Sequence, residues 1–284
     1  MHILGITTPL LRAGDDLASI LRASCDMHNG DILVISSKAI ATCEGAAIDL
    51  ARIKPTDEAM KLSKECHLDP LFTQAVLNET DRLNGAVVGA CPFALLTSLK
   101  PNGMKTGRIL CPNAGLDQSN VQEGCAIGWP KDPVVSAQRL RMTLENLMEG
   151  DRRDRSLRGN RSSRLTSVPS VTHVPSVTFR IAVIISDSCC RPARLGVTAF
   201  ALVCCGIDPM QSEVGKTDLF GKQLRVTQEA VADQLATAAN AVMGNAAQST
   251  PAAIIRDHCI PLSDFCGWVE GIEPEEDLFR NCCR

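Results

Sequence analysis

Three β-branched runs that end abruptly in polar residues constrain the fold more than any other feature of this sequence. They span residues 30–38 (GDILVISSK), 180–188 (RIAVIISDS) and 251–257 (PAAIIRD). Short and nearly continuous apolar runs of this kind predict buried strands. Helical patterns separate these runs along the chain, so we predict a mixed α/β (α+β) fold.

Three segments carry a helical pattern. The longest spans 227–243, with Thr227 as the predicted N-cap and Gly244 as the stop. Its predicted apolar face consists of Val231, Leu235, Ala238, Ala239 and Val242. Further helices are predicted over 134–148 and over 56–66, where a proline precedes the first turn.

Polar residues gather where two of the predicted strands end. Ser36, Ser37 and Lys38 close the first run, and Asp187 with Ser188 closes the second. Because ligands of open α/β sheets bind beyond the carboxyl ends of the strands, these residues are predicted to lie where a ligand is met. Asp117 stands in another polar turn, and carboxylates of this kind suit Mg²⁺ or Mn²⁺.

Composition narrows the classes of function. The net charge of -3 gives no electrostatic reason to expect nucleic acid or an anionic membrane as a partner. No apolar run approaches the roughly 20 residues that a membrane span needs. The N-terminus also lacks the pattern of a secretion signal, so we expect a cytoplasmic protein. The motifs of P-loop, Rossmann and serine-hydrolase proteins are absent.

The sequence contains 14 cysteines, including adjacent pairs at 189–190, 204–205 and 282–283. A long chain without a secretion signal is expected to keep them as reduced thiols that serve as small core residues. No CxxC spacing occurs, so a structural zinc site is not predicted.

We predict one domain over residues 1–256, interrupted by an insertion at 150–178. The insertion is rich in Arg and Ser and repeats VPSVT, which predicts a mobile, extended segment. Its six arginines between Arg152 and Arg164 are not interleaved with aromatic residues, so RNA is not favoured as a partner. Residues 257–284 are predicted to form a tail that packs on the domain or across a dimer interface.

Three sequence blocks occur in a recognisable order. They are NAG-x-D-x-SN at 113–120, SD-x-x-x-RP-x-R-x-G at 186–196 and D-x-x-G-x-x-L-x-V-T at 218–227. In content and order the sequence resembles the coenzyme F420:L-glutamate ligases, also called gamma-glutamyl ligases. The resemblance extends from the N-terminus to about residue 256 and omits the insertion.

The resemblance implies a reaction and its participants. The γ-phosphoryl group of GTP is transferred to a carboxylate of the F420 precursor, and the amine of L-glutamate then displaces phosphate to form an amide. Mg²⁺ or Mn²⁺ is implied as the divalent cation, and K⁺ is an optional further cation. A homodimer with active sites near the subunit interface is also implied.

Carried over residue by residue, the resemblance assigns a role to each matching position. The metal-site residues are Asp117, Asp187, Ser188 and Asn245, and both aspartates also count as catalytic. The nucleotide-binding residues are Gly5, Ile6, Thr7, Thr8, Ser37, Lys38, Thr42, Asn120 and Gly244. The close backbone approach to the nucleotide is assigned to Gly115. From their chemistry, we assign Arg191 and Arg194 to hold a substrate carboxylate or phosphate.

The sequence departs from the family at two of these positions. Thr42 stands where the family usually has a second lysine, and Asn245 where it tends to have Glu or Gln. Four hypotheses therefore stay open: a ligase acting on the F420 precursor, a ligase acting on a folate-like acceptor, a non-catalytic nucleotide or metabolite binder, and a thiol-based sensor. The two aspartates favour a ligase, since a binder has less need of two charged metal ligands.

Overall fold

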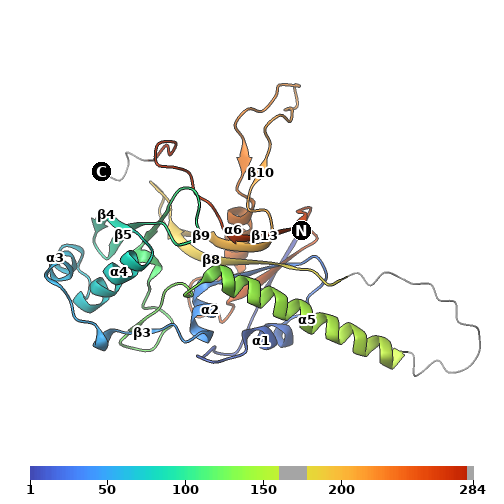
Figure 1. Ribbon diagram of the computed structural model, residues 1–284, viewed down its shortest axis with the longest axis horizontal. Coiled ribbons are helices and arrows are strands. Elements are labelled where there is room, and N and C mark those ends of the chain that lie inside the picture. Colours follow the sequence, from blue (N-terminus) through green and yellow to red (C-terminus); the bar gives the residue numbers. More distant parts are fainter. Residues whose placement is uncertain (160–177, 280–284) are drawn as a thin grey trace, which may run out of the picture.

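A six-stranded sheet forms the centre of the computed structural model, which describes residues 1–159 and 178–279, with only the backbone for 152–159 (Figure 1). In sheet order its strands are β1 (His2–Ile6), β12 (Ala252–Arg256), β2 (Ile32–Ser36), β8 (Ala182–Cys190), β9 (Val197–Ile207) and β13 (Leu262–Trp268). The three β-branched runs form β2, β8 and β12, which are neighbours in this sheet. The mixed α/β prediction is confirmed.

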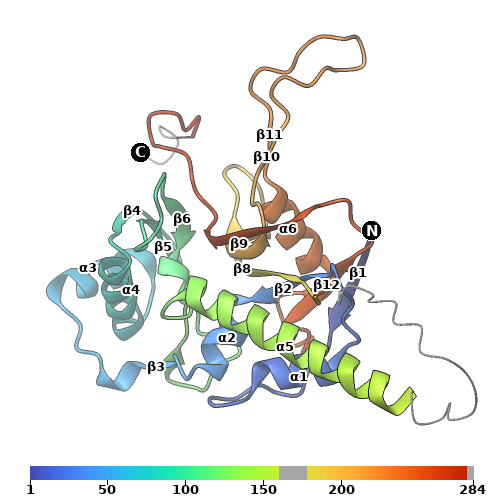
Figure 2. The same ribbon diagram turned by 45° about the vertical axis from the view of Figure 1, so that its right-hand side comes forward.

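Helices cover both faces of the sheet (Figure 2). One face packs against α6 (Val231–Met243), and the other against α1 (Leu17–Ser24), α2 (Ser37–Cys43) and α5 (Pro133–Gly159). Successive residues of β2 therefore enter opposite halves of the core, which explains why its sequence is apolar without alternation.

The predicted helix at 227–243 is shorter than expected. It begins at Val231, and its N-cap is Ala230, without a side-chain capping bond. The prediction of Thr227 as the N-cap is wrong, because residues 228–229 form strand β11. Val242 is 41% exposed and does not belong to the buried face. The buried residues of α6 are Val231, Ala232, Leu235, Ala236, Ala239 and Met243.

A smaller lobe adjoins the sheet through a shared hydrophobic core. Its strands are β4 (Ala86–Cys91), β5 (Ala94–Leu99) and β6 (Ile109–Pro112), and its helices are α3 (Asp57–Cys66) and α4 (Pro70–Arg82). The predicted helix at 56–66 is confirmed, and Thr56 is its N-cap, accepting the backbone N–H of Ala59. Short elements complete the lobe: β3 (Ile48–Asp49), η1 (Leu50–Arg52), η2 (Asn113–Gly115) and β7 (Cys125–Ala126).

Helix α5 extends further than the sequence pattern predicts. The expected end was residue 148, whereas the backbone stays helical to Gly159. Residues 149–159 contain four arginines, and Arg has high helix propensity, which favours continuation of the helix. The first part of the predicted 150–178 insertion is therefore helical, and 160–177 lie outside the described residues.

A narrow arm projects from the body between β9 and α6 (Figures 1 and 2). The strands β10 (Gln211–Ser212) and β11 (Gln228–Glu229) pair at its base. At its far part, Leu219 is 100% exposed and Phe220 is 95% exposed. The arm carries the third sequence block of the resemblance.

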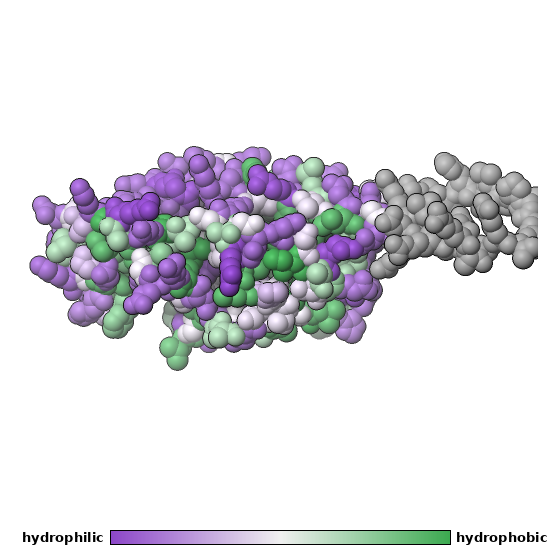
Figure 3. All heavy atoms as spheres, turned by 90° about the horizontal axis from the view of Figure 1, so that it is seen from below, coloured by the Kyte–Doolittle hydropathy of each residue, from purple (hydrophilic) through white to green (hydrophobic). Residues whose placement is uncertain are grey.

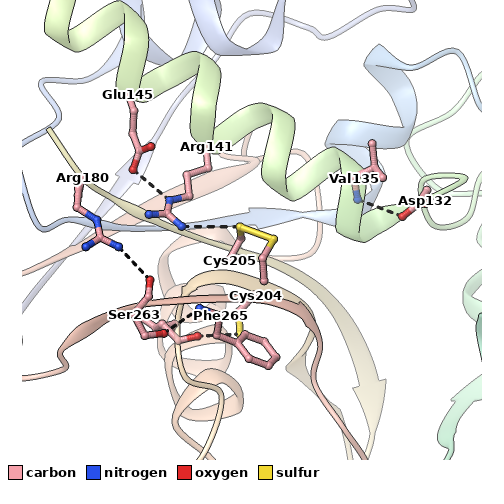
Figure 4. Close-up of a disulfide and its surroundings, with 11 residues drawn as sticks. Asp132, Val135, Arg141, Glu145, Arg180, Cys204, Cys205, Ser263 and Phe265 are labelled. Carbon is pink, nitrogen blue, oxygen red and sulfur yellow. Dashed lines mark hydrogen bonds and ion pairs between the residues drawn. A yellow bond between two sulfur atoms is a disulfide. The ribbon is translucent and has the colours of Figure 1, made fainter. Parts of the chain in front are cut away.

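The predicted tail contributes the edge strand β13 to the sheet of its own chain. Pairing with β9 sets Cys266 directly opposite Cys205, with 4.0 Å between their Cα atoms, and the two form a disulfide. Figure 4 shows this disulfide beside Arg141. Arg141 forms an ion pair with Glu145, with 3.0 Å between Nε and Oε1. The expectation of reduced thiols is therefore wrong for this pair, because a long-range strand pairing brings the two cysteines together. Cys282 and Cys283 lie outside the described residues.

The surface seen from below mixes hydrophilic and hydrophobic residues (Figure 3). Within residues 1–159 and 178–279, no helix is both long and apolar enough to cross a membrane.

Candidate ligand pocket with paired aspartates

A pocket of about 410 Å³ opens beyond the end of β2, beside the second half of β8. The two strands run parallel as far as Ser36, which pairs with Ser186. β2 ends there, whereas β8 continues past its predicted end to Cys190, because Asp187–Cys190 pair with β9. Three loops complete the walls: the N-terminal loop at 8–11, the turn after β6 at 117–120, and the loop after α6 at 244–251.

Backbone contacts hold these loops against the strand ends. The N–H of Thr8 donates to the carbonyl of Ser249 at 2.9 Å, and that of Ser36 donates to the carbonyl of Pro251 at 2.9 Å. Gly244 adopts a positive φ of 71°, and a Cβ there would lie 2.6 Å from the Gln248 side chain. A glycine is therefore required where the loop leaves α6.

In the turn at 113–120, some residues stabilise the fold and others line the pocket. Asn113 accepts the backbone N–H of Leu95 at 2.9 Å. Gly115, with φ 75°, lies against Trp129, since a Cβ there would come within 2.5 Å of the indole nitrogen. The pocket-lining residues of this turn are Asp117, Ser119 and Asn120. Gly115 is thus needed for packing against Trp129, and it does not line the pocket as its expected role required.

Asp117 is held by a cation and a hydroxyl. Its Oδ2 accepts hydrogen bonds from Lys38 Nζ and, at 2.7 Å, from Ser119 Oγ. Its Oδ1 accepts the backbone N–H of Ser119 at 2.9 Å. Burial raises the pKa of Asp117, but the hydrogen bonds from Lys38 and Ser119 outweigh it and hold the pKa below its usual value. Asp117 is therefore ionised at neutral pH.

Asp187 occupies a less polar environment within β8, one residue past the last residue of β8 that pairs with β2. Trp129 Nε1 donates to its Oδ2 at 2.6 Å, and the backbone N–H of Ser188 donates to its Oδ1 at 2.8 Å. Burial raises the pKa of Asp187 to about 6. The hydrogen bonds from Trp129 and Ser188 and the charge of Lys38 oppose the rise, whereas the charge of Asp117 adds to it. The two carboxylates are thus close enough to influence each other.

The structure brings together nine of the residues assigned from sequence. Those that line the pocket are Thr8, Lys38, Thr42, Asp117, Asn120, Asp187, Ser188, Gly244 and Asn245. They come from five separate parts of the chain, so their convergence reflects the fold and not their spacing in sequence.

Six assigned residues do not line the pocket. Gly5 and Ile6 belong to β1, and the Ile6 side chain is buried in the core. Thr7 is exposed and contacts Thr250 through a hydroxyl pair at 3.5 Å. Ser37 is 1% exposed, and its Oγ has no hydrogen-bond partner among the described residues.

The remaining two are the arginines of the turn between β8 and β9. Arg191 and Arg194 are both exposed, and Arg191 Nε donates to Thr198 Oγ1 at 3.1 Å. Neither side chain reaches the pocket lining within this chain.

Ser36, predicted to lie where a ligand is met, also lines the pocket. Sequence reasoning missed several other pocket residues. They are Pro9, Leu10, Leu11, Ala39, Ser119, Ser186, Ala199, Asn240, Met243, Ala246, Ala247, Ser249, Thr250 and Pro251. Ser119 belongs to the NAG-x-D-x-SN block at 113–120, but no role was predicted for it. Asn245 and Ser249, which follow Gly244, were a further signal, because Gly, Asn and Ser favour turns.

The oxygen-rich lining fits a hard divalent cation. Asp117 and Asp187 supply carboxylates, Ser188 a hydroxyl and Asn245 an amide oxygen. No cluster of three or more His, Cys, Asp or Glu side chains is found in the part of the chain that the structure describes. Such a cation would therefore need further oxygen ligands from water or a phosphate, as Mg²⁺ commonly has.

Fold and site together define an α/β protein with a pocket at the edge of its sheet that contains two aspartates. The F420-0:Gamma-glutamyl ligase family matches residues 5–152 and 175–257. The chain belongs to this family.

Three relatives extend the likeness over nearly the whole chain. All three are described as coenzyme F420:L-glutamate ligases. The protein of Methanocaldococcus jannaschii is 32% identical over 99% of this chain and 97% of its own length. That of Archaeoglobus fulgidus is 33% identical over 97% and 94%, and that of Methanothermobacter thermautotrophicus is 34% identical over 88% and 86%.

Proposed function

We propose that this chain is a ligase that uses GTP and a divalent cation to join L-glutamate to a carboxylate of the F420 precursor. The observation that carries the proposal is the pairing of Asp117 and Asp187 in one pocket beside Lys38. Family membership and the names of the relatives support the reaction class. GTP and the acyl phosphate are the parts of the proposal that experiment must decide.

The reaction proposed for this pocket has two steps. A carboxylate oxygen of the acceptor attacks the γ-phosphorus of GTP, GDP leaves, and an acyl phosphate forms. The amine of L-glutamate then attacks the acyl carbon, inorganic phosphate leaves, and the nitrogen gives up a proton. When bound, Mg²⁺ or Mn²⁺ neutralises negative charge that develops on the phosphoryl oxygens.

The side chains of the pocket bind and orient these groups. Lys38 has three donors, of which Asp117 and Ser119 take two, so one remains for a phosphate oxygen. Asp117, Asp187, Ser188 and Asn245 would hold the cation. Asn120 and Thr42 line the same pocket and offer polar contacts to the nucleotide.

The enzyme is proposed to act as a homodimer in the cytoplasm, where GTP is available. The exposed Leu219 and Phe220 of the arm support a second subunit, since large apolar side chains exposed together often mark an interface. Residues 218–227, the third sequence block, do not line the pocket of their own chain. Contact with a second subunit would give this block a role in the dimer.

A non-catalytic nucleotide binder is the second candidate. Thr42 and Asn245 favour it, because both line the pocket at positions where the family tends to have residues with longer side chains. The acceptor is also open between the F420 precursor and a folate-like molecule.

Product mass decides among these candidates. The protein is incubated with GTP, L-glutamate and Mg²⁺ or Mn²⁺, with the F420 precursor and a folate offered in parallel. We expect a gain of one or more glutamyl units on the F420 precursor, together with release of GDP. Glutamylation of folate alone would identify the other acceptor, and nucleotide binding without any glutamylated product would leave the binder.

A further inference from the structure

One short segment of the chain contacts both aspartates of the pocket. Ile127 exchanges two backbone hydrogen bonds with Asp117, each of 2.9 Å. Two residues later, Trp129 donates its indole N–H to Asp187 Oδ2 at 2.6 Å. Residues 127–129 therefore fix the position of Asp117 through its backbone and that of Asp187 through its side chain.

The indole has a limited chemistry at this position. Its N–H is a donor only and carries no charge, so it can hold a carboxylate oxygen but cannot serve as a metal ligand. With the Ser188 N–H on Oδ1 and the indole on Oδ2, both oxygens of Asp187 are held in place. Each oxygen retains a lone pair, which leaves the carboxylate able to bind a cation in a fixed orientation.

The position of Trp129 is itself tightly determined. The side chain is 3% exposed, and the backbone of Gly115 lies against the edge that bears the nitrogen. The ring of Trp268 packs against it with 6.3 Å between ring centroids. Trp268 in turn donates its N–H to the carbonyl of Asn102 at 3.1 Å. The indole of Trp129 therefore has no room to turn away from Asp187.

We propose that Trp129 is a positioning residue, whose N–H orients the Asp187 carboxylate for a divalent cation shared with Asp117. The inference rests on the proposed function, since that function supplies the cation. Groups that hydrogen-bond a metal-ligating side chain commonly contribute a factor of about 10 to 100 in metal affinity. A loss of this size is the effect that removal of the indole N–H should have.

The test compares two matched substitutions in the full-length protein. Trp129→Phe removes the N–H that holds Asp187, while Trp268→Phe removes an N–H that is bonded to a backbone carbonyl in the same cluster. Binding of Mn²⁺ is followed by the loss of its electron paramagnetic resonance signal, with and without GTP. We expect Mn²⁺ affinity to fall by about 10- to 100-fold for Trp129→Phe and to stay at the wild-type value for Trp268→Phe.

A second variant disturbs the hydrogen bond between Trp129 and Asp187 without replacing Trp129 itself. Gly115→Ala places a Cβ against the indole nitrogen and should displace it from Asp187, so Mn²⁺ affinity should fall again. Thermal melting of each variant shows whether it is folded at the assay temperature.

Three results would overturn the inference, and failure of the positioning role can be told apart from failure of metal binding. If the wild-type protein binds Mn²⁺ and folded Trp129→Phe binds it equally well, the indole does not position the carboxylate. The same conclusion follows if the two phenylalanine variants lose equal affinity. If the wild-type protein binds no Mn²⁺ at all, the metal dependence of the proposed function fails, and this inference fails with it.

Discussion

At the scale of single residues, Asp117 carries the largest expected effect. Asp117→Asn removes the charge beside Lys38 but keeps the backbone bonds to Ile127, so the fold should persist. We expect kcat for glutamyl transfer to fall by about 100-fold or more, since one charged group of the pocket is lost. The matched control is Asp264→Asn, because Asp264 also forms an ion pair, with Arg180, but lies outside the pocket. Equal activity of the two variants in a steady-state assay would contradict the assignment.

Thr42 allows a prediction of improved binding. Its side chain lines the pocket at a position where the family resemblance implies a second lysine. Thr42→Lys should tighten GTP binding by about tenfold, because a charge-assisted hydrogen bond to a phosphate oxygen is added. Isothermal titration calorimetry measures the effect, and Thr42→Met serves as the control for size. Weaker binding by the lysine variant would show that the nucleotide phosphates do not lie near Thr42.

The sequence predicted the pocket at this scale through motifs and strand ends. Lys38 and Asp187 could be placed together because two apolar runs ended in polar residues, and parallel strands end at one sheet edge. Trp129 could not be given its role in this way. Its contact with Asp187 depends on how a loop 58 residues earlier in the chain packs across the sheet edge, which no local pattern encodes.

At the scale of elements, the disulfide between β9 and β13 makes a strong prediction. It joins cysteines 61 residues apart, and closing a loop of that length constrains the unfolded chain by about 4 kcal/mol in the chain-entropy account. Cys266→Ser should therefore lower the free energy of unfolding by roughly that amount. Chemical denaturation measures the change, and a reducing agent should reproduce it in the wild-type protein. No change in either experiment would show that the bond contributes nothing to stability.

Strands that are buried on both faces were easier to predict from sequence than elements whose bounds depend on pairing with another strand. β2, β12 and the first half of β8 are apolar on both faces, and their sequences predict strands. The continuation of β8 to Cys190 depends on its pairing with β9 and was not predicted. The start of α6 was misplaced because residues 228–229 pair with β10 at the base of the arm. Likewise, only the pairing of β13 with β9 determines which two of the cysteines bond.

At the scale of the whole molecule, the arm makes a prediction about assembly. Leu219 and Phe220 are almost fully exposed, and a second subunit would cover them if the proposed homodimer uses this surface. Replacing both with Asp should convert the dimer to a monomer without lowering the melting temperature of the monomer fold. Light scattering after size-exclusion chromatography measures the mass. A dimer that survives the double substitution would exclude the arm as its main contact.

The central claim, that this pocket activates a carboxylate with GTP and couples it to L-glutamate, is tested most directly by an isotope measurement. The acceptor is labelled with ¹⁸O in its carboxylate and incubated with GTP, L-glutamate and Mn²⁺. If an acyl phosphate forms, one labelled oxygen leaves with the phosphate for each amide made, and Asp117→Asn should suppress both products together. Unlabelled phosphate alongside glutamylated product, or hydrolysis of GTP with no product, would contradict the claim.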